Sequence, residues 1–250
     1  MRKKLTSNLD KAKIPEHIAM IMDGNGRWAK RKGIDRISGH KEGMKSVRSV
    51  VKAANELGIR LVTLFAFSEQ NWKRPKVEVD ALMELLKQYL LKERKRLVQN
   101  GIRLNAIGRL WELPKDVFLV LMETIEMTKK CNSLILTLAL SYGGREEIVD
   151  AVKEIISRRD IIPDEINEQN FSSYLYTVDL PEPDLLIRTS GEFRLSNFLL
   201  WQLAYTEIYF TKTLWPDFRK KHLIKALLNY QRRERRFGLT SDQTGRRKVR

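Results

Sequence analysis

The sequence predicts one α/β domain built on a central, mostly parallel sheet of about six strands flanked by helices. Short continuous apolar runs alternate with longer segments of helical periodicity, which is typical of β–α–β units whose sheet is covered on both faces. The chain has 250 residues, of which 42% are hydrophobic, enough for one sizeable core. No change in composition marks a second domain. We therefore treat residues 1–250 as one unit, with flexible ends at 1–13 and 239–250.

The predicted strands and helices alternate along the chain. Gly58 and the pair Asn100-Gly101 end two helical segments, and Pro114 opens a third, since these residue types stop and start helices. Continuous apolar runs predict strands at 18–22, 61–67, 102–107, 134–140, 184–187 and 208–210. Apolar residues at helical spacing predict helices at 47–57, 79–97, 117–125, 148–156 and 216–237.

Charge and segment length limit the possible functions. Lys and Arg number 47 against 31 Asp and Glu, and the net charge of +16 suits nucleic acid, an anionic membrane surface or phosphorylated small molecules. No apolar run approaches the roughly 20 residues of a membrane span. The basic N-terminus lacks the apolar segment of a signal peptide, so we expect a cytoplasmic protein. The single cysteine, Cys131, excludes an internal disulfide and a thiolate zinc cluster.

The first turn after an apolar run combines glycines with an acid. Residues 24–29 read GNGRWA and match G-x-G-x-x-A, a loop that presents backbone amides to a pyrophosphate at a helix N-terminus. A dinucleotide site also needs an acid about 20 residues later at a strand end, but Glu42 falls in helical sequence, which weakens that interpretation. Asp23 would repel a bare pyrophosphate and is a candidate ligand for Mg²⁺. Glu207, just ahead of the last strand, is a candidate second ligand, with a solvated strand-end acid as the alternative.

Polar turns follow four of the apolar runs. They are rich in Gly, Ser, Asn and Arg, which supply hydrogen-bond donors for phosphate oxygens. Ligands of open α/β sheets bind outside the carboxyl ends of the strands, so we expect these turns to meet at one edge and form an anion site. They are 23–27 (DGNGR), 68–74 (SEQNWKR), 141–145 (SYGGR) and 188–192 (RTSGE).

Further arginines extend this candidate site. Arg188, Arg194 and Ser196 place two guanidiniums and a hydroxyl close together in sequence, where they could clamp a second anion or form a salt-bridged surface loop. Arg36 and His40 lie four residues apart and could share a helix face toward the first loop, although a lone histidine is often structural.

Two tryptophans and one helix point to an apolar cavity. Trp28 and Trp72 sit in polar turns and could wall a cavity or stack on a substrate. The helix predicted at 79–97 is apolar almost all round, so it is either buried on two sides or lines a cavity.

Six segments together resemble the cis-prenyltransferase family, and most closely the bacterial undecaprenyl pyrophosphate synthases. They occur in the family's order and spacing over residues 14–238. They read HIAMIMDGNGRWAK, GHKEG, FSEQNWKRP, YGGREEIVDA, PDLLIRTSGEFRLSNFLLWQLAYTEIYF and ERRFG. The aspartate-rich DDxxD pair of trans-prenyltransferases is absent from the sequence.

The resemblance implies a Mg²⁺-dependent transferase that condenses an allylic diphosphate, typically farnesyl diphosphate, with successive isopentenyl diphosphates. The expected product is a long cis-polyprenyl diphosphate of undecaprenyl length, the precursor of the lipid carrier for cell-wall polysaccharides. A shorter-chain synthase is the alternative. The resemblance also implies a homodimer, and an apolar tunnel for the growing chain lined by residues 79–97 and 134–138.

The resemblance assigns roles residue by residue. The allylic diphosphate would be held by Gly24, Asn25, Gly26, Arg27, Trp28, Arg36 and His40. Isopentenyl diphosphate would be held by Arg188, Arg194, Leu195 and Ser196. The segment that closes over both would supply Ser68, Glu69, Gln70, Asn71, Trp72 and Arg74. Magnesium would bind Asp23 and Glu207, and a C-terminal R-x-G element, Arg236 and Gly238, would reach into the partner's site.

Asn71 is often assigned a role in removing the proton from isopentenyl diphosphate. A neutral amide is a poor base, because general-base catalysis favours a pKa near the working pH. We therefore expect Asn71 to orient the substrate, with released pyrophosphate or Asp23 accepting the proton.

The sequence departs from the family pattern at two positions, and three other functions remain as alternatives. Phe193 stands where some bacterial relatives carry His, and Ser141 where Asn is common; we expect retained activity.

A nucleic-acid-binding module is disfavoured because the arginines cluster at strand ends beside glycines. A non-catalytic partner subunit is disfavoured by the retained acids and arginines, and a dinucleotide-dependent reductase by the position of Glu42. The charge and a lipid product predict salt-releasable contact with the inner face of the membrane.

Overall fold

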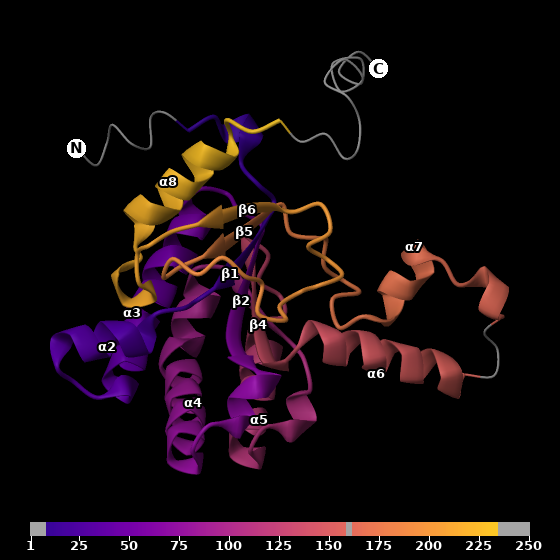
Figure 1. Ribbon diagram of the computed structural model, residues 1–250, viewed down its shortest axis with the longest axis horizontal. Helices are drawn as coiled ribbons and strands as arrows, with labels where there is room; N and C mark the ends of the chain where they lie inside the picture. Colours follow the sequence, from indigo (N-terminus) through magenta and orange to yellow (C-terminus); the bar gives the residue numbers. More distant parts are fainter. Residues whose placement is uncertain (1–8, 159–161, 235–250) are drawn as a thin grey trace.

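The structure is a computed structural model that describes residues 9–158 and 162–234. Its centre is a six-stranded sheet with the order β3-β4-β2-β1-β5-β6, in which neighbouring strands are parallel (Figure 1). This confirms the predicted α/β fold and the number of strands. The strands are β1 (His17–Ile21), β2 (Leu61–Ser68), β3 (Ile102–Ile107), β4 (Leu134–Tyr142), β5 (Leu185–Arg188) and β6 (Glu207–Phe210).

Helices cover one face of the sheet, and a long irregular segment covers much of the other. The helices are α2 (Asn25–Lys32), α3 (Arg36–Glu56), α4 (Lys76–Gln99), α5 (Lys115–Thr128), α6 (Gly144–Ser157), α7 (Glu168–Phe171) and α8 (Lys220–Tyr230). Ile18 and Met20 of β1 face the core formed with α3, α4, α5 and α8. Their neighbours Ala19 and Ile21 point the other way, because strand side chains alternate, and pack with Phe198 in the segment between β5 and β6.

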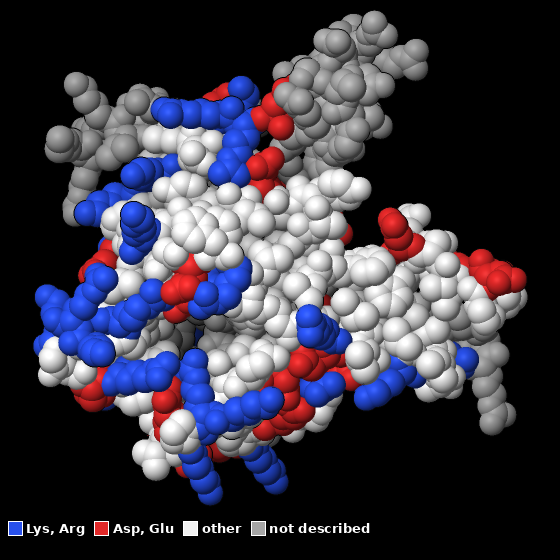
Figure 2. Space-filling view, in the orientation of Figure 1, with Lys and Arg blue, Asp and Glu red and all other residues white. Residues whose placement is uncertain are grey.

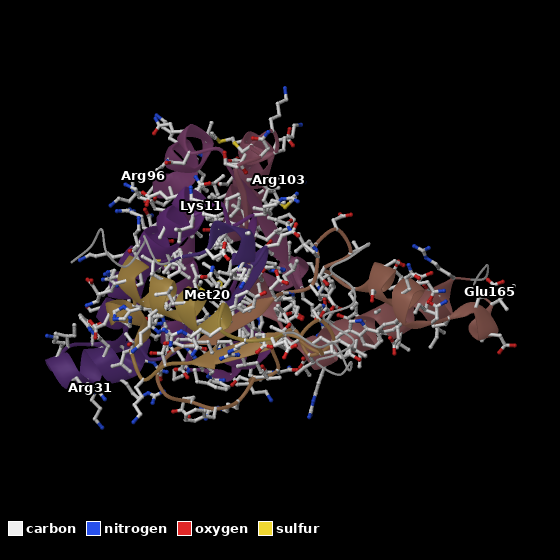
Figure 3. All side chains as sticks on the ribbon, turned by 90° about the horizontal axis from the view of Figure 1, so that it is seen from above. Lys11, Met20, Arg31, Arg96, Arg103 and Glu165 are labelled. Atoms are coloured by element: carbon white, nitrogen blue, oxygen red, sulfur yellow. The ribbon has the colours of Figure 1, made fainter. Side chains whose placement is uncertain are left out.

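The helices α6 and α7 extend away from the sheet. Figure 1 shows them projecting to one side, and Figure 3, which labels Met20 near the centre and Glu165 at the far tip, shows the same extension from above. The α6 surface exposes apolar side chains, with Ile156 76% exposed. No helix within the described residues has both the length and the apolar character to cross a bilayer.

Several boundaries differ from those predicted. The helix expected at 47–57 begins at Arg36, because the Asp35 side chain caps it by accepting a hydrogen bond of 2.8 Å from the Ser38 amide. Residues 9–13, expected to be flexible, include the 3₁₀ helix η1 (Lys11–Lys13), and the Asp10 carbonyl accepts a 2.7 Å hydrogen bond from Gln231.

The predicted final helix, 216–237, is wrong at both ends. Trp215–Asp217 forms the 3₁₀ helix η6, the chain is extended at Phe218 and Arg219, and α8 then runs from Lys220 to Tyr230. Residues 231 and 232 form a turn, 233 is a bend, and 235–237 lie outside the described residues.

The strand order creates a reversal point at the centre of the sheet. From β1 the chain moves to β2 on one side and later returns to β5 on the other. Ile21, the last residue of β1, is in register with Arg188, the last residue of β5. Ligands of doubly wound sheets bind outside the carboxyl ends at such a point, so the site is expected here.

Candidate active site

A cavity of about 810 Å³ opens at the carboxyl ends of the strands. All four polar turns singled out in the sequence contribute to it. Its polar lining comprises Asp23, Ser68, Gln70, Asn71, Arg74, Arg145, Glu146, Arg188, Arg194, Ser196 and Asn197. The cavity therefore joins cationic and hydrogen-bonding groups from distant parts of the chain at one edge of the sheet.

A second cavity, of about 460 Å³, lies beside the N-terminus of α2. Gly24 caps this helix with φ of 109°, a left-handed conformation that favours glycine. A Cβ at Gly24 would also lie 2.9 Å from Leu214 Cδ2. This path therefore favours glycine at position 24, and Gly24 and Gly26 line the cavity at the N-terminus of α2, a place where phosphate binds in many proteins.

Asp23 lies between the two cavities and lines both of them. Its backbone carbonyl accepts hydrogen bonds from Thr189 Oγ1 at 2.7 Å and from the Trp215 amide at 3.0 Å, which fixes the residue in place. Its carboxylate Oδ2 lies 3.0 Å from Arg188 Nη2 and 3.6 Å from Arg27 Nη2.

Carboxylates hold the arginines of the second cavity. Arg27 Nη1 forms a 2.9 Å ion pair with Glu192, and Arg36 Nε lies 3.3 Å from Glu78. Glu78 Oε1 also accepts a 3.0 Å hydrogen bond from Arg74. These pairs position the guanidiniums before any ligand binds, and an anion can then compete with the partly exposed acids.

Arg188 holds the other side of the large cavity. The residue is 2% exposed, and its Nη1 donates to Ser196 Oγ at 2.7 Å and to the carbonyl of Arg194. Its buried Nε has no hydrogen-bond partner in the protein. Arg194 is 60% exposed and pairs with Glu192. One guanidinium is therefore fixed by packing, while the other can move toward a ligand.

His40 lies on α3 at the edge of a third, mostly apolar cavity of about 140 Å³. Burial, followed by the positive charges of Arg74 and Arg36, lowers the pKa of His40 to about 4, against an opposing contribution from Glu78. His40 is therefore neutral at physiological pH and can donate or accept a hydrogen bond.

The third cavity adjoins the large one, because Met22, Phe65, Asn71 and Arg74 line both. The helix α4 supplies part of its wall, which includes Met44, Phe67, Leu82, Met83, Leu85, Leu86, Leu140 and Trp215. The structure therefore shows an apolar space beside the anion site. It does not show the continuous tunnel predicted from the sequence.

The 3₁₀ helix η2 (Glu69–Lys73) follows β2 and borders the large cavity. Asn71 Oδ1 accepts a 3.2 Å hydrogen bond from the Ser68 amide, so the Asn71 side chain helps to shape the turn. Trp72 does not line the large cavity: its ring packs edge-on against Phe67 and its Nε1 donates to Ser141 Oγ at 2.6 Å.

Four predicted site residues in the described chain line none of the three cavities: Trp28, Glu69, Trp72 and Glu207. Trp28 Nε1 donates a 2.9 Å hydrogen bond to Asp217, away from the three cavities. Glu207 opens β6 in register with Leu185, so it lies at the amino ends of the strands, and its Oε2 pairs with Arg233 at 2.7 Å. It is therefore not beside Asp23 within one chain. Arg236 and Gly238 lie outside the described residues.

Seven residues that line the large cavity were not predicted as site residues. They are Ile21, Met22, Phe65, Arg145, Glu146, Asn197 and Leu200. The G-G-R turn after β4 was a signal for Arg145. Asn197 has φ of 63°, and its Oδ1 accepts a 2.9 Å hydrogen bond from the Arg145 amide, a relationship that depends on the tertiary fold.

Asp23 fits a Mg²⁺ site that is completed by a ligand. Magnesium often uses one or two protein carboxylates together with substrate phosphates and water. Asp23 supplies one carboxylate that borders both cavities. No set of three His, Cys, Asp or Glu side chains within residues 9–158 and 162–234 could hold a metal alone.

The fold and site define an α/β protein whose binding region suits a molecule with an anionic head and an apolar tail. The chain belongs to the prenyltransferase family whose model, described as "Putative undecaprenyl diphosphate synthase", matches residues 21–238. An "Isoprenyl transferase" from Chlorobaculum tepidum is 54% identical over 92% of this chain and 88% of its own length. One from Geobacter sulfurreducens is 53% identical over 92% of this chain and 95% of its own length.

The solved structures that are similar to this one include two from different kinds of organism. Lavandulyl diphosphate synthase from Lavandula x intermedia, in complex with dimethylallyl diphosphate, superposes with a TM-score of 0.88 and 40% identity, covering 92% of this chain and 100% of its own. A probable undecaprenyl diphosphate synthase from Campylobacter jejuni has a TM-score of 0.75 and 38% identity over 90% of this chain and 98% of its own.

Proposed function

We propose that this chain is a Mg²⁺-dependent cis-prenyltransferase that condenses farnesyl diphosphate with successive isopentenyl diphosphates into a long-chain polyprenyl diphosphate of undecaprenyl length. The observation that carries the proposal is the position of Asp23 between two cation-lined cavities, 3.0 Å from Arg188. Two diphosphates bound on either side of the Asp23 carboxylate would repel it and one another. A divalent cation between these negative charges removes the repulsion.

The cavity beside α2 suits the allylic diphosphate. The amides of Gly24, Asn25 and Gly26, with Arg27 and Arg36, supply donors and positive charge to the departing diphosphate. These groups stabilise negative charge that develops as the bond to the allylic carbon breaks. Mg²⁺ bound by Asp23 would act as a Lewis acid toward the same oxygens.

The large cavity suits isopentenyl diphosphate. Arg188, Arg194 and Ser196 would hold its head and place the alkene beside the allylic carbon. Asn71 lies between the large and apolar cavities and acts in our proposal by orienting the alkene. The proton released as the new bond forms goes to the displaced pyrophosphate or to Asp23.

The apolar cavity suits the start of the hydrocarbon tail. Its volume of 140 Å³ is below the roughly 300–1,000 Å³ of most ligand pockets, so a long chain requires α4 to move outward. The small cavity is also the observation that favours the second candidate, a shorter-chain synthase. The similarity to lavandulyl diphosphate synthase is consistent with that candidate.

The α6–α7 extension suits a homodimer contact. Val152, Ile155, Ile156, Ile166 and Phe171 line an apolar hollow of about 440 Å³ on it. A second chain would cover these side chains and would bring its C-terminal segment near the site, as the family resemblance implies. Glu207 could then serve a metal only in the partner's site. Ile156→Asp is expected to yield monomers in sedimentation velocity, and an unchanged dimer would argue for another contact.

The α2 surface suits an anionic membrane. Lys30, Arg31 and Lys32 are exposed beside Ile34, which is 44% exposed. Figure 2 shows Lys and Arg gathered over α2. We expect salt-sensitive binding to anionic vesicles, weakened in a variant with all three basic residues changed to Gln. Equal binding by both proteins would exclude this surface.

Product analysis tests the proposed function. The chain is incubated with farnesyl diphosphate, labelled isopentenyl diphosphate and Mg²⁺, and the lipid is analysed by mass spectrometry. We expect a polyprenyl diphosphate series that ends at undecaprenyl length and is lost with EDTA. A single short product would favour the second candidate, and absence of condensation would reject both.

A further inference from the structure

Ser141, at the end of β4, lies at the centre of a polar cluster that the proposed chemistry does not use. Its Oγ lies 2.9 Å from Glu69 Oε2 and 2.5 Å from Glu112 Oε2, and it accepts the 2.6 Å hydrogen bond from Trp72 Nε1. Glu69 and Trp72 belong to η2, whereas Glu112 belongs to the 3₁₀ helix η3 (Leu110–Glu112).

These contacts require a proton on one of the two carboxyl groups. A hydroxyl has one proton to donate and two lone pairs that accept, and the Trp72 N–H occupies one lone pair. Ser141 can therefore donate to only one carboxylate. The other contact is a hydrogen bond only if that carboxyl is protonated and donates to the remaining lone pair.

The surroundings favour this protonated state. Burial raises the pKa of Glu69 and the facing Glu112 carboxyl adds to the rise, while hydrogen bonding by Ser141 and the charge of Arg109 oppose it. Arg109 is largely engaged elsewhere, because it forms 2.7 Å and 2.9 Å hydrogen bonds to Asp150.

The other charged and titratable groups around the cluster are also paired. Tyr176 donates to Asp150 at 2.6 Å, and Gln70 donates to Glu146 at 3.2 Å. Arg109 Nη1 lies 3.7 Å from Glu112 Oε1. This ion pair opposes the shared proton, but it is longer than the two hydrogen bonds that Arg109 forms with Asp150.

We propose that Glu69 and Glu112 are positioning residues that share one proton across Ser141 and so hold Ser68–Arg74 against η3 and β4. In this conformation Asn71 and Arg74 line the large cavity. Loss of the proton leaves two carboxylates facing one another, and their repulsion releases the segment. The proposal rests on the proposed function only for its effect on catalysis.

Hydrogen exchange tests the proposal without substrate. The amides of Ser68 and Arg74 hydrogen bond to Asn71 and report closure of the segment. We expect their protection, corrected for intrinsic exchange, to fall as pH rises, by about tenfold for each unit by which closure raises the pKa of Glu69. In Glu112→Gln a neutral amide, which does not titrate, replaces one of the two carboxyl groups. The two side chains then no longer repel one another at high pH, so protection should become independent of pH.

A surface variant and a second substitution provide controls. Glu123→Gln changes a side chain that is 63% exposed on α5 and should follow the wild type. Glu69→Gln should lose the pH dependence of protection as Glu112→Gln does, which keeps the test valid if one variant folds poorly. Protection that is constant with pH in the wild type, or that falls equally in Glu112→Gln, would overturn the proposal.

Catalysis provides the second readout. The kcat of the wild type should decline on the alkaline side, and Glu112→Gln should shift or remove this decline while KM for isopentenyl diphosphate changes less than twofold. A structural role alone would lower activity equally at every pH. If condensation is absent but the exchange result holds, the proposed function fails and the proton-sharing pair stands.

Discussion

Asp23 and Arg188 form an ion pair of 3.0 Å across the central reversal of the sheet. Asp23 follows the end of β1, and Arg188 is the last residue of the adjacent parallel strand β5. Arg188 is 2% exposed. A buried cation therefore fixes a partly exposed carboxylate at the mouth of two cavities. Such preorganised charges do not need to reorient when charge develops on a substrate.

Arg188→Lys tests the geometry of this pair. Lysine keeps the positive charge but cannot span Asp23 and Ser196 with a planar guanidinium. Loss of one charged hydrogen bond corresponds to about 1.5–3 kcal/mol, so we expect KM for isopentenyl diphosphate to rise about 10- to 150-fold. Steady-state kinetics measure this, with Arg60→Lys, whose side chain is 73% exposed ahead of β2, as the control. An unchanged KM would remove Arg188 from the binding site.

Gly24→Ala tests the loop conformation, and Gly33→Ala is its matched control. Both glycines have positive φ, of 109° and 67°, which costs alanine about 1–2 kcal/mol. Only Gly24 also faces a clash, with Leu214, whereas no atom lies within 4 Å of a Cβ at Gly33. We expect a larger loss of the unfolding free energy, together with loss of activity, for Gly24→Ala. Equal effects in urea unfolding would contradict the steric argument.

His17 gives the fold a defined pH dependence. Its Nδ1 lies 2.6 Å from the Pro181 carbonyl and its Nε2 2.7 Å from Thr63 Oγ1, and burial lowers its pKa to about 4. The neutral ring stabilises the fold fully above the unfolded pKa of about 6.5. This contribution declines as pH falls toward 4, by up to about 3 kcal/mol.

Urea unfolding at several pH values measures this dependence. The free energy of unfolding of the wild type should fall as pH is lowered from about 6.5 to about 4. Its slope against pH should exceed that of His17→Gln by an amount that corresponds to the uptake of up to one proton on unfolding. Parallel curves for the two proteins would show that His17 does not titrate as the structure indicates.

Leu86 tests the role of the apolar cavity. It lies on α4 and lines the space beside Met22 and Phe65. Leu86→Phe should shorten the products and Leu86→Ala lengthen them, because the side chain limits the room for the tail. Leu91→Ala, on the same helix but 37% exposed, is the control. Product lengths from mass spectrometry that do not change would place the tail elsewhere.

The sequence predicted the features that depend on local pattern. The apolar run before Asp23 and the glycines after it indicated both β1 and the α2 loop. The start of α3 was missed because its first turns contain Gly39 and Gly43, whose lack of side chains allows close packing against Asn25 and Trp215. That packing partner is visible only in the tertiary structure.

Other site features depend on strand direction and order. Glu207 is the first residue of β6, and in a parallel sheet this places it at the edge opposite Asp23. The sequence alone does not show that β4 lies between β3 and β2, which brings Ser141 next to Glu69. Charge pairs such as Arg36 with Glu78 likewise join helices whose packing has no local signal.

Mg²⁺-dependent condensation by Asp23→Asn is the most direct test of the account. Asparagine keeps the size of the side chain but removes the charge that would hold a divalent ion between two diphosphates. In single-turnover assays with farnesyl and isopentenyl diphosphates, we predict a loss of at least about 100-fold, compared with little change for the surface variant Asp116→Asn. Wild-type rates in Asp23→Asn, with the same dependence on Mg²⁺, would contradict the proposed site.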